Sequence, residues 1–193
     1  MTLARTALTL AALLALGACD SMTEAPPAAT APAESAATGS AAQATGSLAL
    51  EGEGLRAFTV EGSARPLPFG TSREATLAAV STMLATPAPA LTTNTECGAG
   101  PTQFAEYPNG LQLAFQDDKF AGWFLDEAGL TTADGVGVGT SRADLQSARV
   151  IEMVPNSTLG AEFSSGELGG FLSSDAADAT VESLYAGLTC FFR

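Results

Sequence analysis

The chain has 193 residues, of which 21 are Asp or Glu and 8 are Lys or Arg, so its formal net charge is −13. A chain of this length can bury the core of one domain or of two small ones. Its acidity argues against nucleic-acid binding, because it has few cations to neutralise phosphates. It has no histidine, the commonest general base and metal ligand, so most hydrolase, dehydrogenase and zinc chemistries lose their usual residues.

Residues 1–18 have the pattern of a signal peptide. Arg5 supplies a positive charge, and a mainly apolar run follows over residues 7–16, too short to span a bilayer. The run ends in Leu16-Gly17-Ala18-Cys19, which resembles the lipobox of bacterial lipoproteins. That resemblance implies that Cys19 becomes the acylated N-terminus and a firm membrane anchor. An ordinary secretory signal is the alternative, and Asp20 leaves the choice of inner or outer membrane open.

Residues 19–46 consist mostly of Ala, Thr, Pro, Ser and Gly. Such a stretch cannot bury enough apolar surface to offset the entropy lost on ordering, so we expect a disordered tether. Its coil reach is roughly 25–30 Å, which would let a folded domain at 47–193 stand off the membrane.

With Cys19 acylated, Cys97 and Cys190 remain as an even number in an oxidising compartment. A disulfide between them would close a loop of about 94 residues and stabilise the domain by roughly 4–5 kcal/mol. Two buried free thiols are the alternative. A catalytic cysteine is disfavoured because no histidine is present to lower its pKa.

A four-residue repeat organises the folded part. Gly70-Thr71-Ser72-Arg73 recurs as Gly139-Thr140-Ser141-Arg142. Thr71 with Glu74, and Ser141 with Asp144, have the spacing of helix N-caps, and the first helix should stop at Pro87. The sequence therefore predicts an α+β fold of two tandem repeats, each a short helix followed by an antiparallel β-meander. Repeat one covers about 67–130 and repeat two about 136–193.

The first meander can be predicted in detail. Strands at 102–108, 111–116 and 119–125 are joined by Asn109-Gly110 and Asp117-Asp118, each expected to be a two-residue turn. That register predicts one core face, made of Phe104, Leu111, Leu113, Phe115, Phe120 and Phe124.

The second meander is less regular. It is expected to contain a hairpin of 159–164 with 167–172 around Ser165-Gly166, and a last strand pair, 181–186 with 188–192, broken at Gly187.

The opposite face of the first meander carries Tyr107, Gln112 and Trp123. Tyr and Trp bring large contact area at low entropic cost, so these three residues are the candidate partner-binding site. The alternative is that this face is covered, by N-terminal strands around 48–60 or by the other repeat.

The repeat also resembles a known architecture. Gly70-Thr71-Ser72 with Leu84-Ala85-Thr86-Pro87, and Gly139-Thr140-Ser141 with Met153-Val154-Pro155, are similar to the repeat of the beta-lactamase inhibitor protein family and of SmpA/OmlA-type assembly lipoproteins. More loosely, the chain resembles uncharacterised bacterial envelope lipoproteins with a two-cysteine domain. Ala85 replaces the glycine usual before that proline, and no inhibitor-specific residue can be carried across. The resemblance implies architecture, and function only by analogy.

Other motifs point to no chemistry. The glycines within 134–140 do not have dinucleotide-loop spacing, and Lys119, the only lysine, is in no phosphate-binding loop. Five carboxylates could suit calcium, but turns are where Asp usually occurs; they are Asp117, Asp118, Asp126, Glu127 and Asp134. We therefore assign no catalytic residue, metal, cofactor or nucleotide.

The sequence as a whole predicts a lipid-anchored, non-catalytic envelope protein facing the periplasm. It would bind another protein, or assist envelope assembly, through a sheet face. The alternative is a carboxylate-based enzyme or a cation-dependent binder acting on an envelope polymer.

Overall fold

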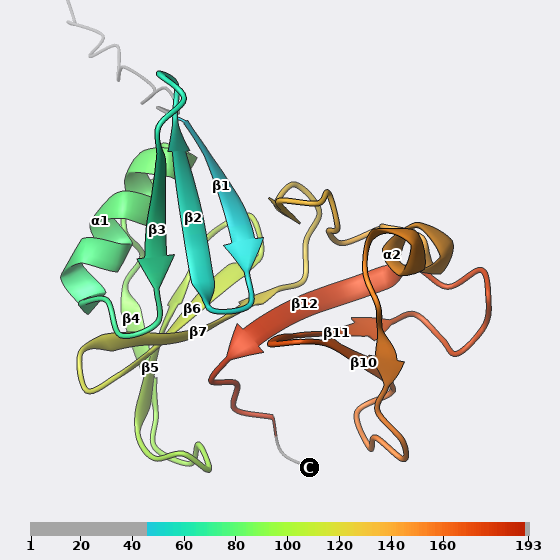
Figure 1. Ribbon diagram of the computed structural model, residues 1–193. Helices are drawn as coiled ribbons and strands as arrows, with labels where there is room; N and C mark the ends of the chain where they lie inside the picture. The colour runs from blue at the N-terminus through green and yellow to red at the C-terminus, as the bar shows by residue number, and fades with distance from the viewer. Residues whose placement is uncertain (1–45, 192–193) are drawn as a thin grey trace, which may run out of the picture. The chain divides into compact units, whose positions relative to one another are not determined.

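The computed structural model describes residues 46–191, which belong to one compact unit (Figure 1). The signal peptide, Cys19 and the tether lie outside the described residues. The described chain is mainly β-sheet with two short helices and one disulfide, Cys97–Cys190, and so has the predicted α+β character. The helices are α1 (Arg73–Leu84) and α2 (Arg142–Ala148), and the strands are β1 (Gly46–Glu51), β2 (Gly54–Thr59), β3 (Ala64–Pro68), β4 (Leu91–Asn94), β5 (Thr102–Glu106), β6 (Leu111–Gln116), β7 (Lys119–Leu125), β8 (Thr131–Thr132), β9 (Glu152–Met153), β10 (Ala161–Ser165), β11 (Leu168–Leu172) and β12 (Val181–Gly187).

The smaller sheet has the strand order β3-β2-β1-β8, with β8 parallel to β1 and the other neighbours antiparallel. Gly52 and Glu53 form the tight connection between β1 and β2. Apolar side chains from the first three strands are buried in the common core, as the hydrophobic effect requires; they are Leu48, Leu50, Leu55, Ala57 and Leu67.

The larger sheet has eight strands in the order β4-β5-β6-β7-β12-β11-β10-β9. Each half is an antiparallel run of consecutive strands, and β7 and β12 join the halves. At that joint Phe124 lies opposite Tyr185. Helix α1 precedes the first half along the chain and α2 precedes the second.

The two sides of this sheet differ. Figure 1 shows the smaller sheet and α1 above β6 and β7, and contacts of α1 and β2 with β7 agree. We call this side the inner face. The segment that follows β12 runs along the opposite side, the outer face.

Helix α1 begins one residue later than the capping pattern predicts. Its N-cap is Ser72, which accepts a hydrogen bond from the Ala75 N–H. Thr71 instead donates its hydroxyl to Pro68, and its carbonyl accepts the N–H of Phe120 in β7. Thr71 is thus held by the neighbouring sheet, and the next hydroxyl caps the helix.

The other helix signals are confirmed. Helix α1 ends at Leu84, and Ala85 has a left-handed backbone, two residues before Pro87. Helix α2 has the predicted N-cap, since Ser141 accepts the Asp144 N–H and donates its hydroxyl to the Asp144 carboxylate.

The predicted register between β5 and β6 is wrong by one residue. Tyr107 donates its N–H to Leu111, and Gly110 donates to Tyr107, so the loop has three residues and not two. Pro108 has no N–H with which to pair with Leu111, as a two-residue loop would require, and proline suits the second position of a turn. Gly110 has the positive φ that ends a three-residue loop of this kind. Ala105 therefore faces Leu113, and Phe104 points to the outer face and not into the core.

A bulge in β7 changes a second set of side chains. The Asp117-Asp118 turn and the pairing of Phe115 with Phe120 are as predicted. Past Phe120, however, the register shifts at Ala121, so Leu113 faces Trp123. Trp123 and Leu125 become core residues, and Phe124, predicted for the core, lies on the outer face.

The predicted last strand pair is also corrected. Strand β12 runs through Gly187, and residues 188–191 form no strand. Instead Leu188 donates its N–H to Ala121, and its backbone lies so close to Gly122 that a Cβ there would be 2.2 Å from the Leu188 carbonyl oxygen. The chain end thus crosses the outer face beside the bulge.

The chain has one tryptophan, so its fluorescence reports the environment of Trp123 alone. Since Trp123 is only 1% exposed, we expect blue-shifted emission that acrylamide quenches poorly. Unfolding in urea provides the control, in which emission shifts to the red and quenching rises. Red-shifted, easily quenched emission from the native protein would contradict the bulged register.

Candidate functional site

The predicted trio Tyr107, Gln112 and Trp123 does not form one surface. Tyr107 is 4% exposed and Trp123 is 1% exposed, and both point to the inner face. Gln112 lies on the outer face, where it pairs with Phe124. The candidate site is therefore corrected: only Gln112 remains on an accessible face, because the three-residue loop and the bulge turned the other two inward.

Tyr107 and Trp123 have structural partners instead. The Trp123 indole N–H donates to the Glu51 carbonyl over 2.9 Å, and the Tyr107 hydroxyl lies 3.0 Å from that of Ser81 in α1. Burial raises the pKa of Tyr107, and the hydrogen bond with Ser81 offsets this only in part. The alternative that N-terminal strands cover this face is confirmed for Trp123.

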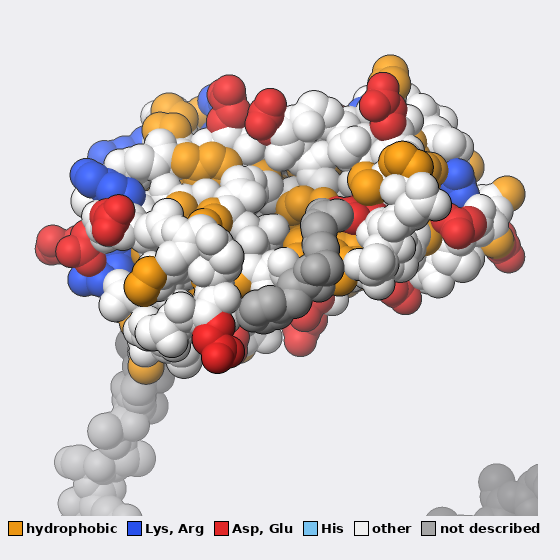
Figure 2. Space-filling model, turned by 90° about the horizontal axis from the view of Figure 1, so that it is seen from below, with side chains coloured by type: hydrophobic (Ala, Val, Ile, Leu, Met, Phe, Trp, Pro, Cys, Tyr) orange, Lys and Arg blue, Asp and Glu red, His pale blue; other side chains and the backbone are white. Residues whose placement is uncertain are grey.

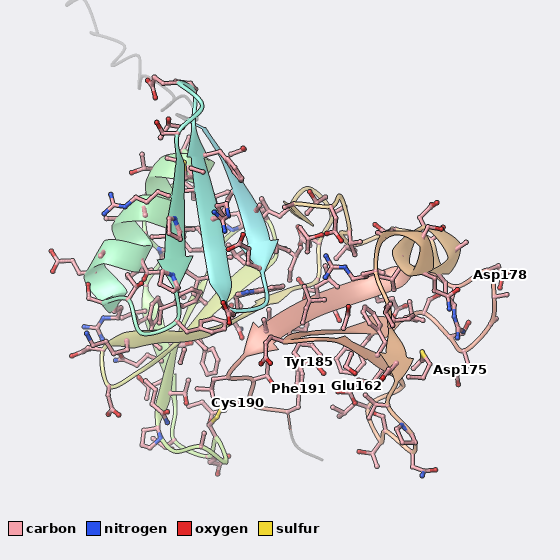
Figure 3. The ribbon with its side chains drawn as sticks, viewed as in Figure 1. Glu162, Asp175, Asp178, Tyr185, Cys190 and Phe191 are labelled. Carbon is pink, nitrogen blue, oxygen red and sulfur yellow. A yellow bond between two sulfur atoms is a disulfide. The ribbon has the colours of Figure 1, made fainter. Side chains whose placement is uncertain are left out.

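An aromatic cluster on the outer face takes their place as the main accessible feature. Phe191 packs edge-on against three rings, at centroid distances of 6.0 Å from Phe124, 5.5 Å from Phe171 and 5.2 Å from Tyr185. Figure 3 shows Phe191 and Tyr185 together on the lower side of β12. These four half-buried residues, which we call the outer aromatic cluster, lie where the two halves of the sheet meet.

A buried carboxyl group adjoins the cluster. Glu162 of β10 is 1% exposed and accepts hydrogen bonds of 2.6 Å from the Tyr185 and Ser157 hydroxyls. The Tyr185 ring crosses β11 above Gly169, where a Cβ would be 2.3 Å from the ring. A glycine is thus required there, and it lets Tyr185 reach Glu162 two strands away.

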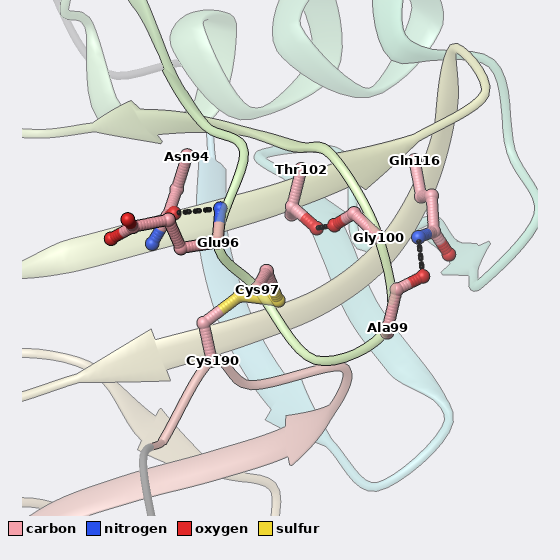
Figure 4. Close-up of a disulfide and its surroundings, with 8 residues drawn as sticks. All are labelled: Asn94, Glu96, Cys97, Ala99, Gly100, Thr102, Gln116 and Cys190. Carbon is pink, nitrogen blue, oxygen red and sulfur yellow. Dashed lines mark hydrogen bonds between the residues drawn. A yellow bond between two sulfur atoms is a disulfide. The ribbon is translucent and has the colours of Figure 1, made fainter.

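The disulfide fixes the chain end near this cluster. Cys97, in the loop between β4 and β5, is bonded to Cys190, one residue before Phe191 (Figure 4). The loop is itself hydrogen-bonded, since Gln116 donates to Ala99 over 2.6 Å and Gly100 donates to Cys97 over 2.8 Å. Phe191 is therefore held between a covalent bond and aromatic contacts.

Two hollows open on the outer face beside the chain end. The larger, of about 390 Å³, is lined by neutral side chains, and we call it the Phe104 hollow; its lining includes Thr92, Asn94, Phe104, Gln112, Phe124, Leu188 and Phe191. The second, of about 360 Å³, we call the acidic hollow; its lining includes Glu106, Gln112, Phe124, Asp126 and Glu127. Figure 2, seen from below, shows hydrophobic side chains in the middle of this face and basic ones toward its margins.

The repeated arginines, and two of the five carboxylates considered for calcium, have local structural roles. Arg73 pairs with Asp118 at 2.6 Å, and Arg142 donates to the Asp175 carbonyl over 2.5 Å. Burial tends to raise the pKa of Asp134, but hydrogen bonds from Thr132 and Arg149 and the positive charge of Arg149 outweigh it and lower that pKa. Within residues 46–191, no group of three or more His, Cys, Asp or Glu side chains is placed to hold a metal ion.

Neither helix of the described chain has the length and apolar character needed to cross a membrane.

Comparison with known proteins adds little. No family model matches the chain, and no curated protein does. One solved structure that is similar to it is that of the uncharacterized protein YfeY from Escherichia coli, at 11% identity and a TM-score of 0.41. The likeness covers 62% of this chain and 90% of that one. So distant a likeness supports no conclusion about function.

Sequence reasoning missed the outer aromatic cluster. Phe124 is expected in the core, and Phe171, Tyr185 and Phe191 are not connected with it. For Phe104, which lines the neighbouring hollow, one usable signal is Pro108, which favours the three-residue loop. No local signal placed Phe191, because its position depends on a disulfide partner 93 residues from Cys190.

The two tyrosines offer matched substitutions. Tyr185→Phe removes a hydrogen bond to a buried carboxyl group, so we expect it to lower the free energy of unfolding by about 1.5–3 kcal/mol. Tyr107→Phe removes one to a neutral hydroxyl, for which we expect about 0.5–1.5 kcal/mol. Urea unfolding followed by circular dichroism measures both. A larger loss for Tyr107→Phe would contradict the assigned role of Glu162.

The disulfide should stabilise the domain through its long loop. We expect Cys97→Ala with Cys190→Ala to lower the free energy of unfolding by roughly 4–5 kcal/mol, because closing such a loop restricts the unfolded chain. Urea unfolding with and without dithiothreitol measures the effect. The reductant should destabilise the wild type and leave the double variant unchanged; a wild type insensitive to complete reduction would refute the prediction.

Proposed function

We propose that this chain is a lipid-anchored, non-catalytic envelope protein that binds a partner protein through the outer face of its eight-stranded sheet. The sequence supports the anchor and the location: residues 1–18 have the pattern of a signal peptide, Cys19 follows in a lipobox-like motif, and an Ala-, Pro- and Thr-rich stretch precedes β1. The domain would stand in the periplasm on that tether.

The Phe104 hollow carries the binding part of the proposal. It combines phenylalanine rings with Thr, Asn and Gln side chains, and among residues 46–191 no carboxylate or basic group lines it. Aromatic surface gives binding energy at low entropic cost, and neutral polar groups fix orientation. A neutral lining suits recognition better than acid–base catalysis, which needs a titratable group at the reacting atom.

The same proposal includes two tandem repeats of a helix and a meander. In support, Gly70 donates to the Phe120 carbonyl and Gly139 donates to that of Val181. Thr71 and Thr140 then accept the N–H groups of those same two residues, so both repeat motifs bind a strand in one pattern. If Phe120 and Val181 are equivalent, then Phe124 and Tyr185 are equivalent too, because each lies four residues further along its strand.

A pseudo-twofold axis would then pass between Phe124 and Tyr185, which face each other at the joint. The outer aromatic cluster would lie on that axis. A surface built from both repeats is larger than either alone could offer, which favours a macromolecular partner.

A second candidate is the carboxylate-based enzyme or cation-dependent binder acting on an envelope polymer. Its support is the acidic hollow, where Glu106, Asp126 and Glu127 line one space. It predicts activity or binding that is lost when these carboxylates are neutralised, with the Phe104 hollow unimportant.

Site-specific photocrosslinking tests the proposed function. A benzophenone amino acid replaces Thr92, which is exposed at the rim of the Phe104 hollow, in cells that produce the protein. We expect one discrete protein adduct, and we expect Phe104→Ala to abolish it because that ring forms the wall of the hollow. The same photoreactive residue at Val150, which is 84% exposed, serves as the control.

An adduct that persists in Phe104→Ala, or forms equally at Val150, would refute binding through this hollow.

The lipid anchor is tested in the same cells. Cys19→Ser should move the protein from the membrane fraction to the soluble fraction and remove the label of an alkynyl fatty acid. Unchanged fractionation and labelling would refute the lipid anchor.

A further inference from the structure

The Phe104 hollow and the acidic hollow are adjacent on the outer face, and we treat the two together as one groove. Both are lined by Gln112 and Phe124, so they meet across β6 and β7. The groove begins beside the disulfide at Cys190 and ends at the loop between β5 and β6. We call it the outer groove.

The two halves of the outer groove differ in charge. Its first half is lined by neutral side chains, whereas its far end carries Glu106, Asp126 and Glu127, all exposed. No Lys or Arg lines either half in the part of the chain that the structure describes. The groove therefore has a neutral half that contains aromatic rings, and a negative end.

The negative end is held in place by packing. A Cβ on Gly110 would lie 2.6 Å from an Asp126 carboxylate oxygen and 2.7 Å from Glu127. The absence of a side chain on Gly110 lets the segment after β7 lie against the loop. On the other side, Gln112 donates its amide N–H to Glu106 over 2.9 Å, which holds that carboxylate beside Gln112.

We propose that the segment bound in the outer groove is an extended, positively charged stretch of the partner protein. Its Lys or Arg side chains lie over Glu106, Asp126 and Glu127, and its apolar side chains lie against Phe104 and Phe124. This inference rests on the proposed function and names the chemistry of its partner.

Charge complementarity selects this occupant. A chain of net charge −13 attracts cations over a distance, and the carboxylates then fix which end of a basic segment binds where. A cation that crosses the exposed part of the Phe124 ring gains a further cation–π contact. The same carboxylates repel anionic lipid headgroups, so a membrane surface is the poorer occupant.

The neighbouring strand favours a polypeptide. Strand β4 is the edge of the eight-stranded sheet, and its residues Thr92, Thr93 and Asn94 line the groove. An edge strand offers backbone N–H and C=O groups to an extended chain, which is a common mode of peptide recognition. A segment that pairs with β4 would lie beside the sheet, and it would have to turn onto the outer face to cross Phe104 and Phe124 and reach the carboxylates.

Peptide titration of the full chain, purified in detergent, tests the proposal. The probes are three fluorescein-labelled peptides, Gly-Phe-Gly-Phe-Gly-Lys-Gly-Lys-Gly and its analogues with Glu or Gln in place of Lys, followed by fluorescence anisotropy; in an extended chain the two Phe and the two Lys side chains lie on one face. We expect the Lys peptide to bind tightest, and we expect its affinity to fall as the salt concentration is raised. Glu106→Gln with Asp126→Asn and Glu127→Gln should weaken its binding roughly tenfold, because the variant removes the carboxylates that form exposed ion pairs with both lysines.

The matched control removes the same charge elsewhere. Glu152→Gln with Asp175→Asn and Asp178→Asn neutralises three exposed carboxylates of the other half, and Figure 3 shows Asp175 and Asp178 well away from the aromatic cluster. We expect this variant to bind like the wild type. Equal weakening in both variants would mean attraction by net charge alone and would overturn the proposal.

Three further outcomes separate this inference from the proposed function. If the Thr92 adduct is lost in Phe104→Ala but unaffected by neutralising Glu106, Asp126 and Glu127, the partner binds here without a basic segment, and only this inference fails. If the Gln or Glu peptide binds as well as the Lys peptide, the inference likewise fails. If no adduct forms at Thr92 at all, the proposed function fails with it.

Discussion

The pairing of β7 with β12 is the interaction on which the rest of this structure depends. It joins two four-stranded runs into one sheet, and it sets Phe124 opposite Tyr185 on the outer face. Because side chains alternate along each strand, the same pairing sends Trp123 and Ala186 into the core. The buried interior and the exposed aromatic surface are therefore two consequences of one register.

The outer face is built by contacts between distant parts of the chain. Phe191 comes from the chain end, Phe171 from β11 and Phe124 from the first meander, and a disulfide holds the first of these in place. Beside them, Glu162 is buried under Tyr185, which crosses the sheet above Gly169. A buried carboxyl group needs several hydrogen-bond donors, so this region is ordered by polar as well as apolar contacts.

Much of the fold followed from local signals. Strand β6 has the predicted bounds, the Asp117-Asp118 turn and the Ser141 cap are where the pattern puts them, and Cys97 pairs with Cys190. The errors came from single-residue shifts. A loop of three residues in place of two and one bulge at Ala121 exchanged the two faces, so Phe104 and Phe124 moved out and Tyr107 and Trp123 moved in.

The sequence by itself determined features that depend on near neighbours: charge, the two helices, strands β6 and β7, the Asp117-Asp118 turn and the cysteine count. It also predicts a lipid anchor at Cys19, which lies outside the described residues. The tertiary structure alone decided which face is covered, because a strand's period of two makes both registers locally acceptable. That choice rests on β1 meeting Trp123 and on the chain end crossing β7, contacts between residues far apart in the sequence.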